Sequence, residues 1–156
     1  MEDAFKFDES AHGLCSETDY PYIAKDDEMC MTNCTKVPGS VVTDYLDIDE
    51  KDKHGLLASL ALQPTSIAMQ ADQLSFQFYS SGVFSEEDCG ETGAIDHGVL
   101  AVGYGTDEET GKKYFTVKNS WGPDWGENGF FRLARQSKNE WGTCAILRVM
   151  TAPIVA

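Results

Sequence analysis

One histidine and one asparagine in this 156-residue chain are spaced to act together as a base and its orienting partner. His97 follows Asp96 and opens the apolar stretch HGVLAVGYG, and Asn119 ends the alternating stretch KYFTVKN. Two antiparallel strands joined by the polar turn around Gly111 would bring these ends close together. An asparagine beside a histidine can accept a hydrogen bond from the ring and fix its tautomer. The spacing therefore predicts a His97–Asn119 pair, against the alternative of a structural histidine at a strand end.

A base of this kind needs a nucleophile, and none of the five cysteines is a convincing one. Cys89 and Cys144 lie in loop-like stretches that suit a disulfide, and Cys15 lies in an acidic loop that disfavours a thiolate. Cys30 and Cys34 form a Cys-x3-Cys motif without a second pair, which is a weak zinc signal. No serine lies in a Gly-x-Ser-x-Gly pattern. The sequence offers a base and an orienting residue without a nucleophile, and it predicts no metal and no cofactor.

Composition and charge limit the expected partners. The chain has 12 basic and 26 acidic residues and a net charge of -14, which argues against nucleic acid or an anionic membrane surface. No apolar run approaches the ~20 residues that span a bilayer, and the first residues lack the features of a secretory signal. Five cysteines leave at least one unpaired within the chain, at a density typical of an oxidising compartment. His12 and His54 have polar neighbours and are interpreted as surface residues.

The secondary-structure elements expected around the pair change along the chain, from helices and loops to strands. A helix is expected in EDAFKF before Gly13, a strand in SVVTDYLDI, a helix in EKDKHGLLASLALQP before Pro64, and a short buried strand in TSIAMQA. From Ile95 the pattern favours strands in HGVLAVGYG, KYFTVKN, NGFFRLAR and CAILRVM. Gly126 and Gly129 mark tight turns. The sequence thus predicts an α+β fold with a helical, loop-rich first part and a β-rich second part.

Three stretches of the chain carry a resemblance to a known family. DHGVLAVGYG, YFTVKNSWGPDWGENGFFRLAR and GLCSETDYPYIAKDDEMC resemble papain-like cysteine proteases, most of all the cathepsin L branch. The resemblance implies an incomplete papain-like fold: a remnant of the helical left subdomain at 1–45, the β-barrel-like right subdomain at 46–145, and a tail at 146–156 that crosses back. In this family the catalytic His and Asn follow the nucleophile by roughly 130–150 residues. The nucleophile segment is therefore expected upstream of residue 1.

The resemblance implies a cysteine endopeptidase that hydrolyses peptide bonds by a Cys-His-Asn mechanism. This chain would supply His97 as general base and later acid and Asn119 as its orienting residue, and it would be inactive alone. Trp121 would shield the His–Asn bond, and Trp125 would line the leaving-group side. The resemblance also places Ala68, Ile95 and Val149 in the apolar pocket for the second residue upstream of the scissile bond, Asp96 in a subsite wall, and Cys89 and Cys144 in a disulfide.

The remaining cysteines and the biological setting stay open at this point. Cys30 or Cys34 would pair with a cysteine of the upstream segment, whereas Cys15 departs from the family pattern and would pair with Cys34 or stay free. The intact parent would act on peptides or proteins, with cystatin-like inhibitors as candidate partners, in a lysosome or vacuole or outside the cell. The alternatives are an incomplete sequence of an active enzyme, and a non-catalytic pseudoenzyme or inhibitor-binding module.

Overall fold

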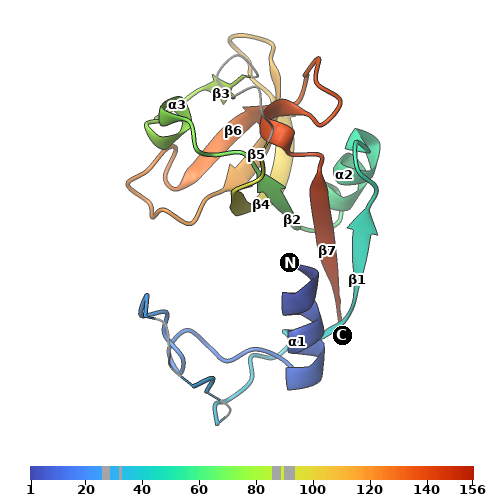
Figure 1. Cartoon of the computed structure of the whole chain (residues 1–156), viewed down its shortest axis with the longest axis vertical. Helices are drawn as coiled ribbons and strands as arrows, with labels where there is room; N and C mark the ends of the chain where they lie inside the picture. The colour runs from blue at the N-terminus through green and yellow to red at the C-terminus, as the bar shows by residue number, and fades with distance from the viewer. Residues whose placement is uncertain (26–28, 32, 86–88, 90–93) are drawn as a thin grey trace. The chain divides into compact units, whose positions relative to one another are not determined.

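The computed structural model describes residues 1–25, 29–31, 33–85, 89 and 94–156 (Figure 1). These residues form two compact units, one of residues 1–46 with 153–156 and the other of residues 47–152. The larger unit contains every residue that the sequence assigns to catalysis or to substrate subsites. The fold of that unit therefore positions the chemistry. No helix in the described ranges is both long enough and apolar enough to cross a membrane.

The smaller unit is built on helix α1 (Glu2–Ala11) and the first part of strand β1 (Val42–Ile48). The helix ends at His12, which adopts a left-handed conformation with φ 54°, directly before Gly13. Asp8 lies in α1 with only 3% of its surface exposed, and its Oδ2 accepts a hydrogen bond from the Val42 N–H at 3.2 Å. A buried carboxylate needs a hydrogen-bond donor, and here the donor comes from β1. The bond therefore joins α1 to β1.

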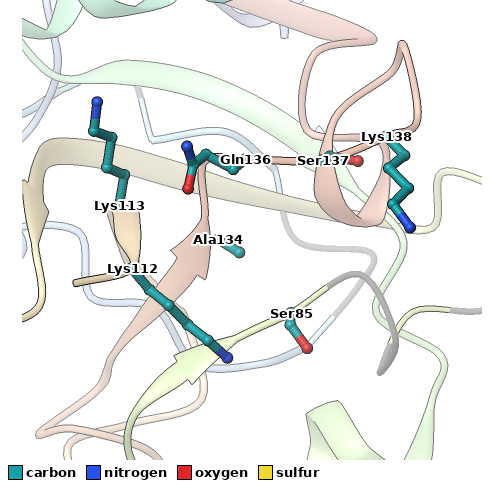
Figure 2. Close-up of a pocket in the computed structure, with 7 residues that line it drawn as sticks. All are labelled: Ser85, Lys112, Lys113, Ala134, Gln136, Ser137 and Lys138. Atoms are coloured by element: carbon teal, nitrogen blue, oxygen red, sulfur yellow. The ribbon is translucent and has the colours of Figure 1, made fainter. Parts of the chain in front are cut away.

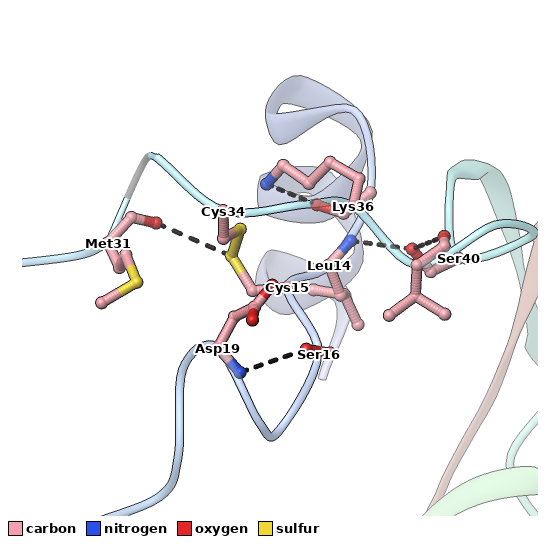
Figure 3. The surroundings of a disulfide bond; sticks show 10 residues. Leu14, Cys15, Ser16, Asp19, Met31, Cys34, Lys36 and Ser40 are labelled. Carbon is pink, nitrogen blue, oxygen red and sulfur yellow. Dashed lines mark hydrogen bonds between the residues drawn. A yellow bond between two sulfur atoms is a disulfide. The ribbon is translucent and has the colours of Figure 1, made fainter.

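A disulfide between Cys15 and Cys34 closes the loop after α1 (Figure 3). The backbones of Cys15 and Lys36 form an isolated β-bridge beside it, and the Lys36 ammonium donates to the Gly13 carbonyl at 2.9 Å. Cys30 is exposed and carries a free thiol. Of the alternatives left open by the sequence, the expectations that Cys15 stays free and that Cys34 pairs with an upstream cysteine are wrong in this structure.

The larger unit contains a mixed sheet whose strands follow the order β7-β2-β4-β5-β6-β3. All neighbouring strands with a determined register are antiparallel except β3 and β6, which are parallel. The strands lie side by side in Figure 1. Their bounds are β2 Thr65–Met69, β3 Val83–Phe84, β4 His97–Thr106, β5 Lys113–Lys118, β6 Phe130–Ala134 and β7 Val149–Val155.

Two helices accompany this sheet. Helix α2 (Lys53–Leu60) begins where the Asp52 carboxylate accepts from the Gly55 N–H at 2.9 Å, and it buries Leu56 completely. Such an N-cap satisfies a backbone donor that the first turn of a helix leaves unpaired. Helix α3 (Leu74–Gln77) is a single turn that buries Phe76. Both α3 and the two-residue strand β3 were missed by the sequence patterns, because elements this short show no periodicity.

The strand predicted in CAILRVM begins too early. Residues Thr143–Ala145 form a 3-10 turn, and β7 starts only at Val149. Cys144 and Ala145 have φ values of 51° and 60°, which lie in the left-handed region and not in the extended region of a strand. The apolar residues of this stretch are buried because the turn packs into the core. A buried turn therefore gave the same run of apolar residues as a buried strand.

Candidate active site

The sheet brings His97 and Asn119 together as their spacing predicted. His97 is the first residue of β4, and Asn119 directly follows β5, the antiparallel neighbour of β4. The register of these strands shifts between Ala101 and Gly103, so a β-bulge lies between the pair and the connecting turn. The His97 Nε2 and the Asn119 Oδ1 are 2.8 Å apart. His97 is half-buried, whereas only 7% of Asn119 is exposed.

The hydrogen bonds of Asn119 determine which nitrogen of His97 carries the proton. Its Oδ1 also accepts a hydrogen bond from the Ser120 N–H at 2.8 Å. An amide oxygen has no proton to give, so the His97 Nε2 must be the donor in the contact with Asn119. Neutral His97 is therefore the Nε2–H tautomer, and its Nδ1 keeps a lone pair. No residue in the described part of the chain bonds to Nδ1, so this nitrogen can accept a proton from another group.

Aromatic rings surround the His97–Asn119 pair on one side. The ring centroids of Trp121 and His97 are 5.1 Å apart, with an angle of 36° between the planes. Trp121 contacts Trp125 at 5.1 Å and Phe76 at 5.5 Å, in both cases edge to face. Trp121 is 41% exposed, so it covers the His97 ring while remaining in contact with solvent. Packing of this kind limits the movement of the imidazole and the access of water to its hydrogen bond.

The residues expected in the apolar subsite lie close to His97 through the strand register. Ala68 on β2 is paired with Gly98 on one side and with Val149 on the other. The next residue of β2, Met69, is paired with His97 itself. Ile95 lies just before β4 and is half-buried. The sheet thus gathers three apolar residues, Ala68, Val149 and Ile95, around the start of β4.

Asp96 has a defined structural role beside His97. Its Oδ1 accepts a hydrogen bond from the Ala71 N–H at 2.8 Å, and its own N–H donates to the Met69 carbonyl at 3.2 Å. These two bonds tie the segment before β4 to the end of β2. The side chain of Asp96 is exposed, so its carboxylate also faces solvent next to His97.

Two residues of α3, Phe76 and Gln77, support the site although the sequence reasoning did not single them out. Phe76 is completely buried and contacts the rings of Trp121 and Trp125, at 5.5 and 5.2 Å. The Trp125 Nε1–H donates to the Gln77 carbonyl at 2.8 Å, which fixes the position of the indole. Phe76 and Tyr79, three positions apart in the stretch FQFY, are a sequence signal that could have indicated a buried aromatic turn.

The two cysteines of the larger unit, Cys89 and Cys144, are joined in a disulfide. Together with the Cys15–Cys34 bond, it leaves Cys30 as the free thiol among the five cysteines. Cys30 lies in the smaller unit. The larger unit, with His97 and Asn119, therefore has no thiol of its own.

A cavity of about 580 Å³ lies away from His97, where β5 begins and β6 ends (Figure 2). Lys112, Lys113 and Lys138 line it together with Ala134 and smaller polar residues. Figure 2 shows that the three ammonium groups point apart, so they do not converge on one anion. The described residues contain no group of three or more His, Cys, Asp or Glu side chains that could hold a metal. Among the described residues of the larger unit, the His97–Asn119 pair is the arrangement suited to proton transfer.

Comparison with known proteins places these features in a family. The family model of the papain family cysteine proteases matches residues 1–154. Cysteine protease 1 of Oryza sativa subsp. japonica is 46% identical over 156 residues, which are 99% of this chain and 31% of the relative. Cathepsin L of Sarcophaga peregrina is 41% identical over 156 residues, which are 99% of this chain and 44% of the relative. The chain therefore spans less than half of the length of these two relatives.

Solved structures give the same result for the fold. The bromelain protease of Ananas comosus, solved with an inhibitor, has a TM-score of 0.88 and 36% identity, with 99% of this chain and 69% of bromelain covered. The ragweed pollen cysteine protease Amb a 11, solved as a proform, has a TM-score of 0.88 and 34% identity over 100% of this chain and 45% of its own. The expected α+β papain-like fold, present in part, is confirmed. The chain belongs to the papain family of cysteine proteases.

Proposed function

We propose that this chain provides the general-base half of a cysteine endopeptidase site, with His97 as the base and Asn119 as the residue that orients it. The observation that carries the proposal is the Asn119 Oδ1, which accepts from both Ser120 N–H and His97 Nε2–H and so leaves the His97 Nδ1 free to accept a proton. A thiol that meets Nδ1 would lose its proton to it and become the thiolate nucleophile. The imidazolium would then return the proton to the leaving amine.

The surroundings support further roles within this proposal. Trp121 covers the His97 ring, and Trp125 is fixed by its bond to Gln77 on the proposed leaving-group side. Ala68, Ile95 and Val149 would form the apolar subsite, so the proposed substrates carry a hydrophobic residue two positions upstream of the bond that is cut. The proposed cellular setting is that of lysosomal or vacuolar proteases. Proteins that inhibit papain-like enzymes in the manner of cystatins are proposed partners of the assembled site.

A nucleophile within the larger unit is not available, because Cys89 and Cys144 are joined to each other. We therefore expect the 156-residue chain alone to show no peptide hydrolysis and no labelling of the larger unit by a thiol-directed peptidyl probe. Labelling is located by mass spectrometry after digestion. Turnover that survives the change His97→Ala would contradict the role of His97.

A chimera supplies the positive test. The chain is joined to the N-terminal part of the cathepsin L-like peptidase of Aedes aegypti, a relative that is 46% identical over 148 residues, which are 93% of this chain and 42% of the relative. We expect this chimera to cleave a fluorogenic peptide with an apolar residue at the second upstream position. His97→Ala should lower kcat by about 10³-fold or more, the scale observed when one member of a catalytic unit is removed. The exposed His54 is the matched control, and His54→Ala should leave kcat unchanged.

The alternative function, a non-catalytic module that binds inhibitors, has its own readout. It predicts that the isolated chain binds a cystatin-type inhibitor in calorimetry, while the chimera does not hydrolyse the peptide. Hydrolysis by the chimera that depends on His97 would exclude this alternative for the assembled protein.

A further inference from the structure

An ion-pair network joins Arg132, Glu127 and Asp107, and Glu127 lies two residues after Trp125 in the chain. Arg132 on β6 donates to the Glu127 carboxylate from Nε at 3.0 and 3.1 Å and from Nη2 at 2.8 Å. Its Nη1 donates to Asp107 in the turn between β4 and β5. Between 16% and 28% of these three side chains is exposed, so the network is partly shielded from water. A guanidinium that bonds two carboxylates through its fork is a rigid connection.

Glu127 is the member of this network that lies in the turn after Trp125. Its Oε1 also accepts from the Gly82 N–H at 2.9 Å. Partial burial by itself would raise the pKa of Glu127, but hydrogen bonds from Arg132 and the Gly82 N–H lower that pKa overall. Burial raises the pKa of Tyr79 to about 12, so its hydroxyl is a neutral group that donates to the Gly82 carbonyl and accepts from the Arg132 N–H. Glu127 is thus an ionised carboxylate held at two fixed points.

The backbone around Glu127 forms a tight turn that is hydrogen-bonded to Asn119. The Glu127 N–H donates to the Phe130 carbonyl, and the Gly129 N–H donates to the Trp125 carbonyl, both at 2.8 Å. Gly126 and Gly129 have φ values of 58° and 87°, which favour glycine. The Gly129 carbonyl in turn accepts from the Asn119 N–H at 2.9 Å. The Gly129 carbonyl of the turn that Glu127 anchors, together with the pairing of Lys118 with Phe130, therefore holds the backbone of Asn119.

We propose that Glu127, through its ion pair with Arg132, is a positioning residue for the His97–Asn119 pair. The inference rests on the proposed function, because it assigns Glu127 to the support of that site. The connection runs from Glu127 through the turn and the Gly129 carbonyl to Asn119, and from the Asn119 Oδ1 to the His97 Nε2. Release of the turn would free Asn119 to rotate, and His97 would lose its single tautomer.

Asp107 provides a matched control, because it pairs with the same guanidinium. Its other side-chain hydrogen bonds to described residues are local, from the Thr110 N–H and hydroxyl in the turn between β4 and β5. Its side chain makes no hydrogen bond or ion pair with the described residues of the turn at 125–129. A general loss of stability would follow from either carboxylate, whereas a loss of positioning should follow from Glu127 alone.

The experiment uses the full chain, labelled with nitrogen-15, and follows its three histidine rings by NMR. The exposed His12 and His54 are internal references. The readouts are the His97 tautomer, from its ring nitrogen shifts, and the protection of its Nε2 proton against exchange. Loss of a charge-assisted bond changes a local opening equilibrium by about tenfold or more, so Glu127→Gln should lower this protection at least about tenfold and mix the tautomers. Asp107→Asn should change it by less than about twofold.

Two further variants complete the test. The exchange of charges, Glu127→Arg with Arg132→Glu, should restore part of the protection that Glu127→Gln loses, and circular dichroism shows that each variant is folded. If Glu127→Gln does not fold, the charge exchange decides: a folded double variant with a mixed tautomer overturns the proposal. Equal effects of Glu127→Gln and Asp107→Asn on His97, or no effect of Glu127→Gln, also overturn it.

The outcome is separable from that of the proposed function. The proposed function fails if the chimera hydrolyses its substrate equally well after His97→Ala, a result that does not involve Glu127. The positioning role fails on the ring spectra of the chain itself, which need no catalysis.

Discussion

Phe76 is the residue on which we expect the aromatic surroundings of His97 to depend most. It is completely buried, and its ring lies 4.9 to 5.5 Å from the rings of four other aromatic residues. Two of these are Trp121, which covers His97, and Trp125. Truncation to alanine would leave a cavity directly beneath both indoles. The change Phe76→Ala therefore tests whether the stability of the larger unit and the order of the site have a common origin.

The magnitude follows from the burial and the ring contacts. Complete burial of a phenylalanine side chain contributes about 2–3 kcal/mol. Each of four ring pairs adds about 0.5 kcal/mol at the low end of the measured range, or about 2 kcal/mol together. The sum of about 4–5 kcal/mol lies within the ~3–5 kcal/mol that large-to-small changes at buried aromatic residues cost. At a slope of ~2 kcal/mol/M, the urea midpoint should fall by about 2 M.

Phe78 is a matched control, because it is the same residue type two positions along the chain and is 79% exposed. Phe78→Ala should change the free energy of unfolding by less than about 0.5 kcal/mol. The assay is urea unfolding followed by tryptophan fluorescence. NMR of the His97 ring protons adds a readout of the site, because they should lose the ring-current shift from Trp121 in Phe76→Ala and keep it in Phe78→Ala.

Two results would refute this reasoning. Equal destabilisation by the two changes would mean that burial of Phe76 does not decide its contribution. A destabilised Phe76→Ala variant with unchanged His97 shifts would mean that Trp121 is held over His97 without Phe76. The milder change Phe76→Leu, which keeps most of the volume, should show the same loss of ring-current shift with a smaller loss of stability.

Three further predictions concern the site, the disulfide and the ion-pair network. Asn119→Ala removes the acceptor of His97, so ring nitrogen shifts should report mixed neutral tautomers, and a single unchanged tautomer would speak against the assigned bond. Cys144→Ser opens a disulfide with a sequence separation of 55, which should lower the free energy of unfolding by about 4 kcal/mol in denaturant titrations; a loss below about 1 kcal/mol would contradict this. Hydrogen bonds from Thr110, and then from Arg132, lower the pKa of Asp107 from 3.8 to about 2. Since this pKa is lower in the folded than in the unfolded chain, the Asp107 carboxylate stabilises the fold above about pH 4, and its contribution is lost as the pH falls toward about 2. Asp107→Asn should therefore flatten the fall in melting temperature over this range, and an unchanged slope would count against the shift.

Much of the fold could be predicted from local patterns. The helix before Gly13, the helix that ends before Pro64 and the strands at β2, β4, β5 and β6 all appear close to their predicted positions. Each of these elements is long enough to show periodic apolar residues or is bounded by glycine or proline. The patterns failed where non-local contacts decide the backbone, as at Cys144, whose left-handed φ accompanies its disulfide to Cys89.

In the candidate site, too, some residues could be predicted from the sequence and others could not. The types and spacing of His97 and Asn119 indicated a base and its orienting partner, because a hairpin of two strands brings their ends together. The sequence also provided the resemblance that the family model matches over residues 1–154. It did not indicate Arg132 and Glu127, since charged residues in a strand and a turn are most often solvated.

The sequence by itself indicated the family and the partial papain-like fold through the resemblance of three stretches spread along the chain. It indicated His97 and Asn119 through their residue types and their separation along one hairpin. Only the tertiary structure decided which His97 nitrogen is free, that Phe76 lies beneath both indoles, and that Cys15 pairs with Cys34. The physical reason is that a tautomer, a ring contact and a disulfide each require atoms from distant segments within a few ångströms. Local periodicity carries no information about such distances, whereas the packed chain fixes them.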